Sequence, residues 1–283
     1  MRVASLVPAA TEILRFLGVE PVGVSHCCAV ADKPVLTESI LPKGLSQAEI
    51  DQRVRQAAQA GQSLYRVRTE VLQSLKPDLI LTQGVCEVCA VGPSELRQAV
   101  DCLSFGVPTL SLQGTRLAHL WDDLRAVAAA TGVSAEAGIE ELQGRLERVR
   151  RAVAGRKRPR VAFVEWLEPP FLGGHWVPDL VEAAGGAPLG ASPEAPSFRT
   201  TWEEIAALQP EVVLFSFCGY GLEAALRDLA GWANPLSGVE CWALDSAYFC
   251  ALTPQVVQGV EILAGILHPG AWPAPAPAEA VRR

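Results

Sequence analysis

The sequence predicts an α/β protein with two similar lobes, each built on a largely parallel sheet, joined by a long rigid helix. Three observations predict this fold. Short apolar runs alternate with helical stretches, which is typical of βαβ units. A helix–proline–strand pattern occurs twice along the chain. Between the two copies, apolar residues recur at helical spacing. With 283 residues, the chain is long enough for each lobe to bury a core of its own.

The first lobe is expected over residues 1–114. Val3–Val7 is an apolar run that predicts the first core strand, and the helix after it begins near Thr11 and ends before Gly18. The expected elements are strands at Val3–Val7, Val22–Val24, Leu79–Thr82 and Pro108–Leu112, and helices at Thr11–Leu17, Ser46–Gly61, Thr69–Leu75 and Ser94–Ser104.

The second lobe is expected over residues 159–270, with a first strand at Arg160–Glu165 and a helix at Pro178–Ala184. Its clearest feature is a segment that repeats a sequence pattern of the first lobe. The segment Glu203–Leu214 aligns with Glu70–Leu81: each reads as a short helix, a proline, an acidic residue and an apolar strand. A helix cannot continue through proline without losing a hydrogen bond, so both helices end at the same point. This match predicts two lobes of similar structure.

Residues 115–158 are expected to form a helical connector, because their apolar residues follow a helical period. Six Arg and Lys residues between Arg148 and Arg158 gather at its end. We interpret them as a solvated face that complements the helix dipole, with a phosphate or nucleic-acid site as the alternative. The Pro- and Ala-rich tail at residues 271–283 is expected to be disordered.

Composition excludes several classes of protein. Hydrophobic residues make up 49% of the chain and charged residues 19%, which is typical of a globular protein. A net charge of −7 argues against a general nucleic-acid binder. The longest apolar runs are strand-sized, so a membrane-spanning protein is not expected. No signal-peptide pattern precedes the first strand, which predicts a cytoplasmic location, or a periplasmic or extracellular one for a chain shortened at its N-terminus.

Common catalytic motifs are absent from the sequence. It contains no GxSxG elbow, no Walker A motif and no HExxH pair. We therefore expect a binding protein rather than an enzyme, with no required cofactor.

Candidate ligand-binding residues lie in the loops that follow the predicted strands, where open α/β sheets bind ligands. They are Pro8, Ala9, His26, Gln83, Cys86, Glu87, Glu165, Trp166, His175, Trp176, Cys218 and Tyr248. This mixture of aromatic, His and Cys side chains suits a large, flat, partly apolar ligand with polar edges. The alternative is that Trp166 and Trp176 pack on each other at the edge of the core.

Two of the eight cysteines form a CxxC motif, Cys86 to Cys89. Thiolates at this spacing can share a metal ion, and His26 or Cys27 could complete the tetrahedral ligand set. The motif is also compatible with a redox pair or with simple packing. Cys102, Cys241 and Cys250 sit among apolar residues, so we expect them to act as small core hydrophobes.

The opening segment Val3–Leu14, followed by Leu17-Gly18 and Val22–Val24, resembles the iron-chelate/vitamin B12 class of periplasmic binding proteins, and Lys76–Leu81 resembles a strand motif of that family. The resemblance covers residues up to Pro269. It implies two Rossmann-like lobes joined by one long helix, which is the class III periplasmic binding protein fold.

Within the family, the chain resembles a cobalamin-binding subgroup in five segments. They are Ser25–Cys27, Ser63–Tyr65, Gln83 with Cys86–Cys89, Glu165–Pro170 and Gly174–Pro178. The resemblance implies that these segments, Tyr65 included, line a cleft between the lobes that binds cobalamin or a similar metal chelate. It also implies an ABC transporter permease as a partner. The alternative function is that of a metal-dependent or redox protein using His26, Cys86 and Cys89.

Overall fold

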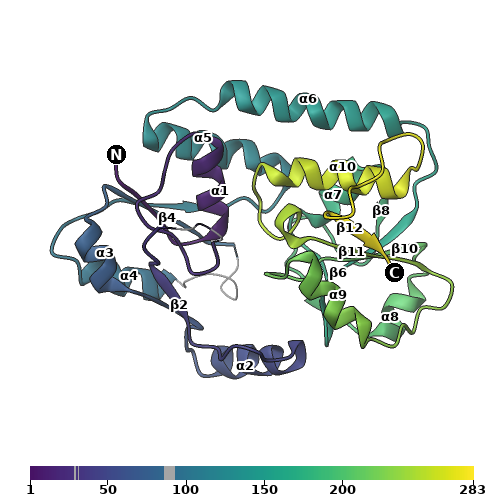
Figure 1. Ribbon diagram of the computed structural model, residues 1–283, viewed down its shortest axis with the longest axis horizontal. Helices are drawn as coiled ribbons and strands as arrows, with labels where there is room; N and C mark the ends of the chain where they lie inside the picture. The colour runs from purple at the N-terminus through teal and green to yellow at the C-terminus, as the bar shows by residue number, and fades with distance from the viewer. Residues whose placement is uncertain (29, 31, 86–92) are drawn as a thin grey trace. The chain divides into compact units, whose positions relative to one another are not determined.

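The chain forms two compact units. The computed structural model describes residues 1–28, 30, 32–85 and 93–283 (Figure 1). The first unit, here the N-unit, comprises residues 1–114 and 121–137, and the second, here the C-unit, comprises residues 115–120 and 138–283. The predicted helical connector is divided between them as two helices, α5 (Leu120–Thr131) and α6 (Glu136–Val153).

The N-unit is built on three parallel strands in the order β1 (Val3–Ser5), β4 (Leu79–Gln83) and β5 (Thr109–Leu112). Its core joins residues of these strands to the surrounding helices, with Ala4, Ile80 and Leu72 fully buried. The other elements are α1 (Pro8–Phe16), β2 (Thr37–Ser39), α2 (Gln47–Gln59), β3 (Tyr65–Val67), α3 (Thr69–Leu75) and α4 (Pro93–Asp101). Strands β2 and β3 pair with each other as an antiparallel ribbon.

The C-unit contains one larger sheet, whose three central strands are parallel. Its order is β12 (Ala280–Arg282), β11 (Glu240–Leu244), β10 (Val212–Phe215), β6 (Arg160–Leu167), β7 (Pro170–Leu172) and β9 (Phe198–Arg199), and β8 (Ala187–Pro188) also pairs with β6. The 3₁₀ helices are η1 (Leu117–His119) and η2 (Ser246–Tyr248), and the α-helices are α7 (Val177–Ala183), α8 (Trp202–Ala207), α9 (Leu222–Ala230) and α10 (Gln255–Leu267).

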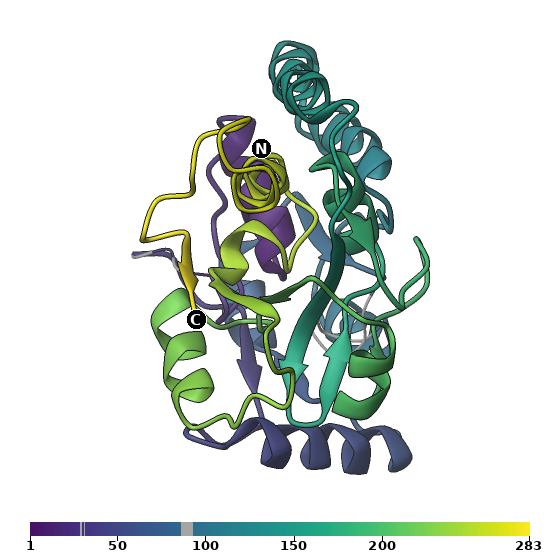
Figure 2. The same cartoon turned by 90° about the vertical axis from the view of Figure 1, so that its right-hand side faces the viewer.

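Alternating residues of the central C-unit strands face one side of the sheet. Val164, Val213 and Ala243 belong there to one buried core. Helices α8 and α9 contribute Ile205 and Ala225 to the same core, and both side chains are fully buried. Helix α10, seen end-on in Figure 2, packs against α7 and η2. The sheet is therefore covered by helices in the manner of a βαβ protein.

The predicted duplication is confirmed in the architecture. In the N-unit, α3 leads into β4, which lies between β1 and β5; in the C-unit, α8 leads into β10, which lies between β6 and β11. The residues before the two prolines, Lys76 and Gln209, both adopt left-handed backbone conformations, with φ of 44° and 52°. The aligned segments thus share backbone geometry as well as sequence pattern.

The acidic residues of the two aligned segments make the same interaction. The backbone N–H of Arg2 donates to Asp78 Oδ2 at 2.7 Å, and the Asp78 N–H donates to the Arg2 carbonyl at 2.8 Å. In the C-unit, the N–H of Arg160 donates to Glu211 Oε2 at 3.0 Å, and the Glu211 N–H donates to the Arg160 carbonyl at 2.8 Å. Each carboxylate therefore fastens the start of the neighbouring parallel strand.

We expect Glu211→Gln to lower the stability of the C-unit at neutral pH. Lys157, the backbone N–H of Arg160 and the Arg160 charge hold the pKa of Glu211 below its ordinary value of 4.5. A carboxylate whose pKa is lowered by folding stabilises the protein above its unfolded pKa, and this contribution is lost as pH falls through the folded pKa. Urea unfolding at a series of pH values should give a lower free energy of unfolding for the variant than for the parent protein at pH 7. This difference should become smaller as the pH falls.

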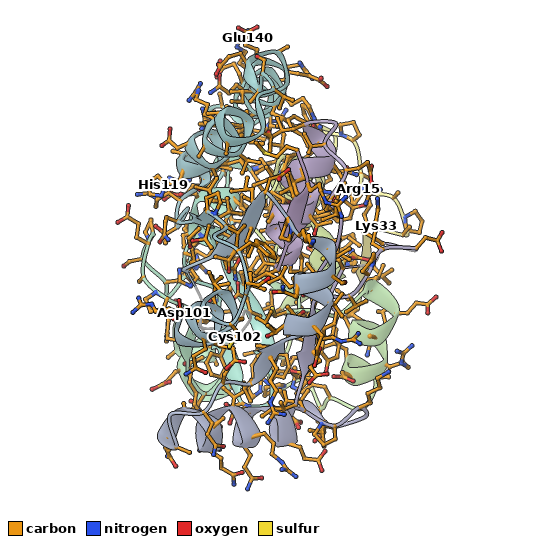
Figure 3. All side chains as sticks on the ribbon, turned by 90° about the vertical axis from the view of Figure 1, so that its left-hand side faces the viewer. Arg15, Lys33, Asp101, Cys102, His119 and Glu140 are labelled. Carbon is orange, nitrogen blue, oxygen red and sulfur yellow. The ribbon has the colours of Figure 1, made fainter. Side chains whose placement is uncertain are left out.

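The control for this substitution is Glu140→Gln, since Glu140 is exposed on α6 of the same unit (Figure 3). A deficit for Glu211→Gln that stays constant down to the lowest pH would contradict the assignment.

Three expectations about secondary structure need correction. The tail is not disordered, because Ala280–Arg282 forms β12 and pairs antiparallel with Leu244–Trp242 of β11. The expected strand at Val22–Val24 is reduced to isolated bridges at Gly23 and Val24. Helices α9 and α10 are absent from the prediction; α10 is apolar on nearly all sides because it is buried, so it lacks the amphipathic period that marks a surface helix.

Among the described residues, every helix is too short or too polar to cross a bilayer.

Candidate functional site

The predicted site residues of the N-unit that the structure describes are here called the N-unit rim: Pro8, Ala9, His26, Tyr65 and Gln83. Pro8 opens α1 directly after the first strand, and Ala9 is buried behind it. The start of α1 is fixed by a chain of small polar groups, since Thr11 Oγ1 donates to Ser5 Oγ at 2.8 Å and lies 3.2 Å from Cys28 Sγ. This network ties the helix to the loop that carries His26.

His26 is held in place by the β2–β3 ribbon. Its Nδ1 lies 2.7 Å from Thr37 Oγ1, which also accepts the His26 backbone N–H at 3.1 Å. The imidazole ring lies 5.5 Å, centre to centre, from the ring of Tyr65 on β3. Its Nε2 lies 3.3 Å from Cys27 Sγ. The structure therefore brings together His26 and Tyr65, which are far apart in the sequence.

Partial burial lowers the pKa of His26, an effect that the nearby charge of Glu38 partly offsets. The imidazole is thus neutral at pH 7. A neutral imidazole can accept a hydrogen bond or bind a metal, whereas a protonated one can do neither.

Gln83 lies at the end of β4, beside a hollow of about 460 Å³. The hollow is lined by Thr82, Gln83, Gly84, Leu96, Arg97, Val100, Thr109, Ser111 and Gln113. Gly84 lies against the amide end of the Gln113 side chain, and a Cβ at this position would lie 2.7 Å from Gln113 Nε2, so a larger residue there would require Gln113 to move. Hydroxyl, amide and guanidinium groups line this hollow, which suits a polar ligand edge.

The corresponding C-unit rim comprises Glu165, Trp166, His175, Trp176, Cys218 and Tyr248. Trp166 lies at the end of β6 and packs edge-on against Tyr220, with ring centres 5.8 Å apart. Tyr220 follows β10, and its backbone carbonyl accepts the N–H of Ser246 at 3.4 Å, which places the loop after β10 beside η2. Both rings are half-buried, so each keeps an accessible edge or face.

His175 and Trp176 form the turn between β7 and α7. His175 has a φ of 50°, which non-glycine residues rarely adopt, and its ring stacks on Trp176 at 5.8 Å. Trp176 Nε1 donates to the carbonyl of Phe249 at 2.8 Å. Trp166 and Trp176 thus pack against different rings, which does not support the alternative in which they pack on each other.

The imidazole of His175 is partly buried, which lowers its pKa. Its Nδ1 is buried and has no hydrogen-bond partner among the described residues. A strained backbone and an unsatisfied ring nitrogen are features that cluster at ligand sites.

A hydrogen-bond network holds the His175–Trp176 turn in place. Ser197 Oγ donates to Glu165 Oε2 and accepts the backbone N–H of Gly174 at 3.0 Å. Gly174 is closely covered by the backbone of residues 195–197, and a Cβ there would lie 2.3 Å from the Ala195 carbonyl oxygen. The loop before β9 therefore fixes both Glu165 and the His175 turn.

Two of the residues that build the C-unit rim are not among the predicted ligand-binding residues. Tyr220 is one of them, although its position after a predicted strand already marks it as an aromatic residue of a strand-end loop. Ser197 lies in a loop without a motif, and nothing in the sequence indicates its contact with Glu165.

The expectation that three cysteines are small core hydrophobes holds for one of them. Cys241 is buried, as expected, whereas Cys102 is exposed. Cys250 is of intermediate exposure, and its Sγ lies 3.6 Å from the Ser216 carbonyl oxygen. An apolar neighbourhood in the sequence therefore does not by itself place a thiol in the core.

The predicted metal ligands are not assembled by the described residues. Cys86, Glu87 and Cys89 lie outside them, so the CxxC hypothesis stays a prediction. Within the described parts of the chain, no group of three or more His, Cys, Asp and Glu side chains is arranged to hold a metal ion.

Comparison with known proteins identifies relatives along most of the chain. Residues 3–234 match the family described as periplasmic binding protein. The vitamin B12-binding protein of Vibrio cholerae is 23% identical over 271 residues, covering 92% of this chain and 86% of the relative. That of Salmonella typhimurium is 22% identical over 270 residues, covering 94% and 90%.

Solved structures share the fold. A periplasmic heme binding protein from Pseudomonas aeruginosa superposes with a TM-score of 0.70 at 20% identity, covering 98% of this chain and 96% of that one. The periplasmic vitamin B12 binding protein of Vibrio cholerae gives a TM-score of 0.66 at 20% identity, covering 94% and 96%. At these identities the likeness establishes the fold alone.

The family match corrects one expectation and confirms others. The predicted cytoplasmic location is contradicted, since the matching family and the solved relatives are periplasmic proteins. The expectation of a binding protein without a required cofactor, rather than an enzyme, is confirmed by the family. The two-unit fold, the duplicated parallel strands and the match over residues 3–234 lead to one conclusion: this chain belongs to the periplasmic binding protein family.

Proposed function

We propose that this protein is the substrate-binding component of an ABC-type uptake system and that its ligand is a corrinoid, a heme or a similar metal chelate. A permease of that system would be the partner that receives the ligand. The observation that carries the proposal is the C-unit rim in a chain of this family. Trp166 and Tyr220 lie at the carboxyl ends of the parallel strands β6 and β10, and the stacked rings of His175 and Trp176 follow the antiparallel strand β7.

The chemistry of the rim supports a large planar ligand. The rings of Trp166, Tyr220, Trp176 and Tyr248 are half-buried, and such rings bind flat apolar surfaces with little loss of side-chain entropy. The neutral imidazoles of His26 and His175 suit polar substituents or an open metal coordination position. Relatives named for vitamin B12 and for heme both fall within this ligand class.

Among these ligands, we propose cobalamin first, because the curated relatives named above are vitamin B12-binding proteins. Titration of the purified protein with cyanocobalamin, hemin and a ferric catecholate chelate, followed by calorimetry and visible absorbance, tests the proposal. We expect saturable one-to-one binding of cobalamin. Binding of hemin or the ferric chelate alone would replace the cobalamin assignment while keeping the ligand class, and no binding of any of the three would overturn the function.

We expect Trp166→Ala to weaken ligand binding about 10- to 100-fold, which corresponds to about 1.4–2.8 kcal/mol and is typical of an aromatic anchor. The measurement is the dissociation constant of the ligand found above. Trp272→Ala is the matched control, because Trp272 belongs to the same unit but lies beyond the end of α10. Equal losses of ligand affinity in the two variants would show that Trp166 affects binding only by stabilising the fold.

The N-unit rim is tested separately with His26→Ala. If His26 contacts the ligand, the variant binds more weakly without a change in the thermal midpoint. Unchanged affinity would remove His26 from the ligand site and leave the C-unit proposal standing.

A further inference from the structure

The hollow of about 460 Å³ at the end of β4 brings polar groups of the N-unit sheet and of α4 together. Thr82 of β4 pairs with Ser111 of β5, and both residues line the hollow. Paired residues of neighbouring strands point to the same face of a sheet, so the two hydroxyls lie on one face. Helix α4 lines the hollow through Leu96 and Val100, which also pack against the core of the N-unit, and through Arg97. A group that enters the hollow therefore meets hydroxyls from the sheet and a guanidinium from α4.

One of these hydroxyls is buried and unsatisfied. Thr82 is 4% exposed, and its Oγ1 has no hydrogen-bond partner among the described residues. A hydroxyl that is buried without a partner costs free energy, and such groups are rare in folded proteins. On the neighbouring strand, Ser111 Oγ accepts a hydrogen bond from Gln113 Nε2 at 2.9 Å, which leaves the Ser111 hydroxyl hydrogen available for a further acceptor. Two hydroxyl donors on adjacent strands thus lack an acceptor.

The charge of the hollow favours an anion. Arg97 is exposed on α4 and forms no ion pair with another described residue. None of the described residues that line the hollow is acidic. The Asp123 carboxylate lies close to the end of β5, but it accepts the backbone N–H groups of Gln113 and Gly114 at 3.3 and 3.2 Å, which partly offset its charge. A guanidinium beside hydroxyl donors matches the oxygen atoms of a carboxylate or a phosphate.

We propose that this hollow is a binding site for an oxyanion, either a carboxylate or a phosphate group, held by the Arg97 guanidinium and by the hydroxyls of Thr82 and Ser111. A single guanidinium in an open hollow binds a free anion weakly, with a dissociation constant in the millimolar range. The same contacts matter more when the anion is part of a larger bound molecule, because its effective concentration is then high. The site itself goes beyond the proposed function, and only its use by an anionic substituent of a metal chelate rests on that function.

Nuclear magnetic resonance of the full, isotope-labelled chain tests the proposal. The protein is titrated with inorganic phosphate and, separately, with malonate, and the backbone amide shifts are followed. We expect saturable shift changes at Thr82, Gly84, Ser111 and Gln113, with dissociation constants in the millimolar range. Sodium chloride at equal ionic strength is the control for general screening. The proposal is overturned if neither anion gives saturable changes at these residues, or if chloride reproduces them.

Two substitutions identify the groups that hold the anion. Arg97→Gln should weaken phosphate binding about 10-fold or more, since it removes a charge-assisted hydrogen bond. Arg53→Gln is the matched control, because Arg53 is exposed on α2 of the same unit and does not line the hollow. Thr82→Val replaces a buried, unsatisfied hydroxyl by a methyl group of similar shape, so it should keep or raise the thermal midpoint while it weakens phosphate binding. Parent-like phosphate affinity in either folded variant, Arg97→Gln or Thr82→Val, overturns the proposal.

Competition separates the two sources of the anion. Cyanocobalamin carries a phosphodiester and hemin carries carboxylates, so each can place an oxyanion in the hollow. If saturating cyanocobalamin or hemin displaces phosphate from the hollow, the site serves an anionic substituent of the chelate; if phosphate stays bound, the site serves a free anion. Both results support the site. The phosphate titration needs no chelate, so its failure leaves the proposed function standing, and failure of the proposed function leaves the anion site standing.

Discussion

Replacing Phe215 by alanine is expected to destabilise the C-unit by about 3–5 kcal/mol, the usual cost of removing a fully buried phenylalanine ring. Phe215 ends β10, is fully buried, and lies at the centre of an aromatic cluster. Its ring centre is 5.1 Å from that of Trp232, 6.0 Å from that of Phe217 and 6.2 Å from that of Trp202. Alanine leaves a cavity that these large rings cannot fill.

Denaturant unfolding followed by tryptophan fluorescence measures this effect, because Trp202 and Trp232 contact the deleted ring. The matched control is Phe198→Ala, a phenylalanine of the same unit that is 37% exposed. The control should lose far less stability. A loss for Phe215→Ala no larger than that of the control would mean that the cluster is not a tightly packed core.

The second large effect is expected for Gly174→Ala, which should cost about 1–3 kcal/mol or more of stability and also weaken ligand binding. The new Cβ would lie 2.3 Å from the Ala195 carbonyl oxygen and 2.5 Å from the Ser197 nitrogen. Both are backbone atoms, so no side chain can move aside. The loop before β9 must shift, which disrupts the contact between Ser197 and Glu165 and the strained turn at His175.

The thermal midpoint and the dissociation constant should both change in this variant. Gly231→Ala is the control, since its Cβ would meet nothing within 4 Å and its φ is −89°. We expect the control to remain within about 0.5 kcal/mol of the parent protein. Unchanged ligand affinity in a folded Gly174→Ala protein would separate the loop from the binding site.

Much of the fold could be predicted because it depends on local patterns. The prolines at 77 and 210 end helices wherever they occur, and the apolar runs after them are strands because they are short and buried. The prediction of a disordered tail was wrong because the structure of the tail depends on a distant segment. Its composition is that of a disordered segment, but Ala280–Arg282 is ordered by pairing with a distant strand, β11.

The candidate site combines predictable and unpredictable parts in the same way. The positions of His26, Trp166 and Trp176 after predicted strands are enough to make them candidates. Thr37 could not be foreseen as the partner of His26, since that contact depends on how the β2–β3 ribbon folds back. Ser197 likewise reaches Glu165 only because its loop crosses the glycine at position 174. Sequence position identifies which side chains reach a strand end, but not which distant side chains meet them there.

The division of the chain into two units has a practical consequence for any attempt to produce them separately. The N-unit takes residues 121–137 from beyond its first segment, and the C-unit takes residues 115–120. A cut at residue 114 therefore gives two fragments, neither of which is whole: the first lacks α5, and the second carries α5 without the unit that it completes. Fragments for crystallisation or display should be designed from the intact chain or with α5 supplied to the N-unit.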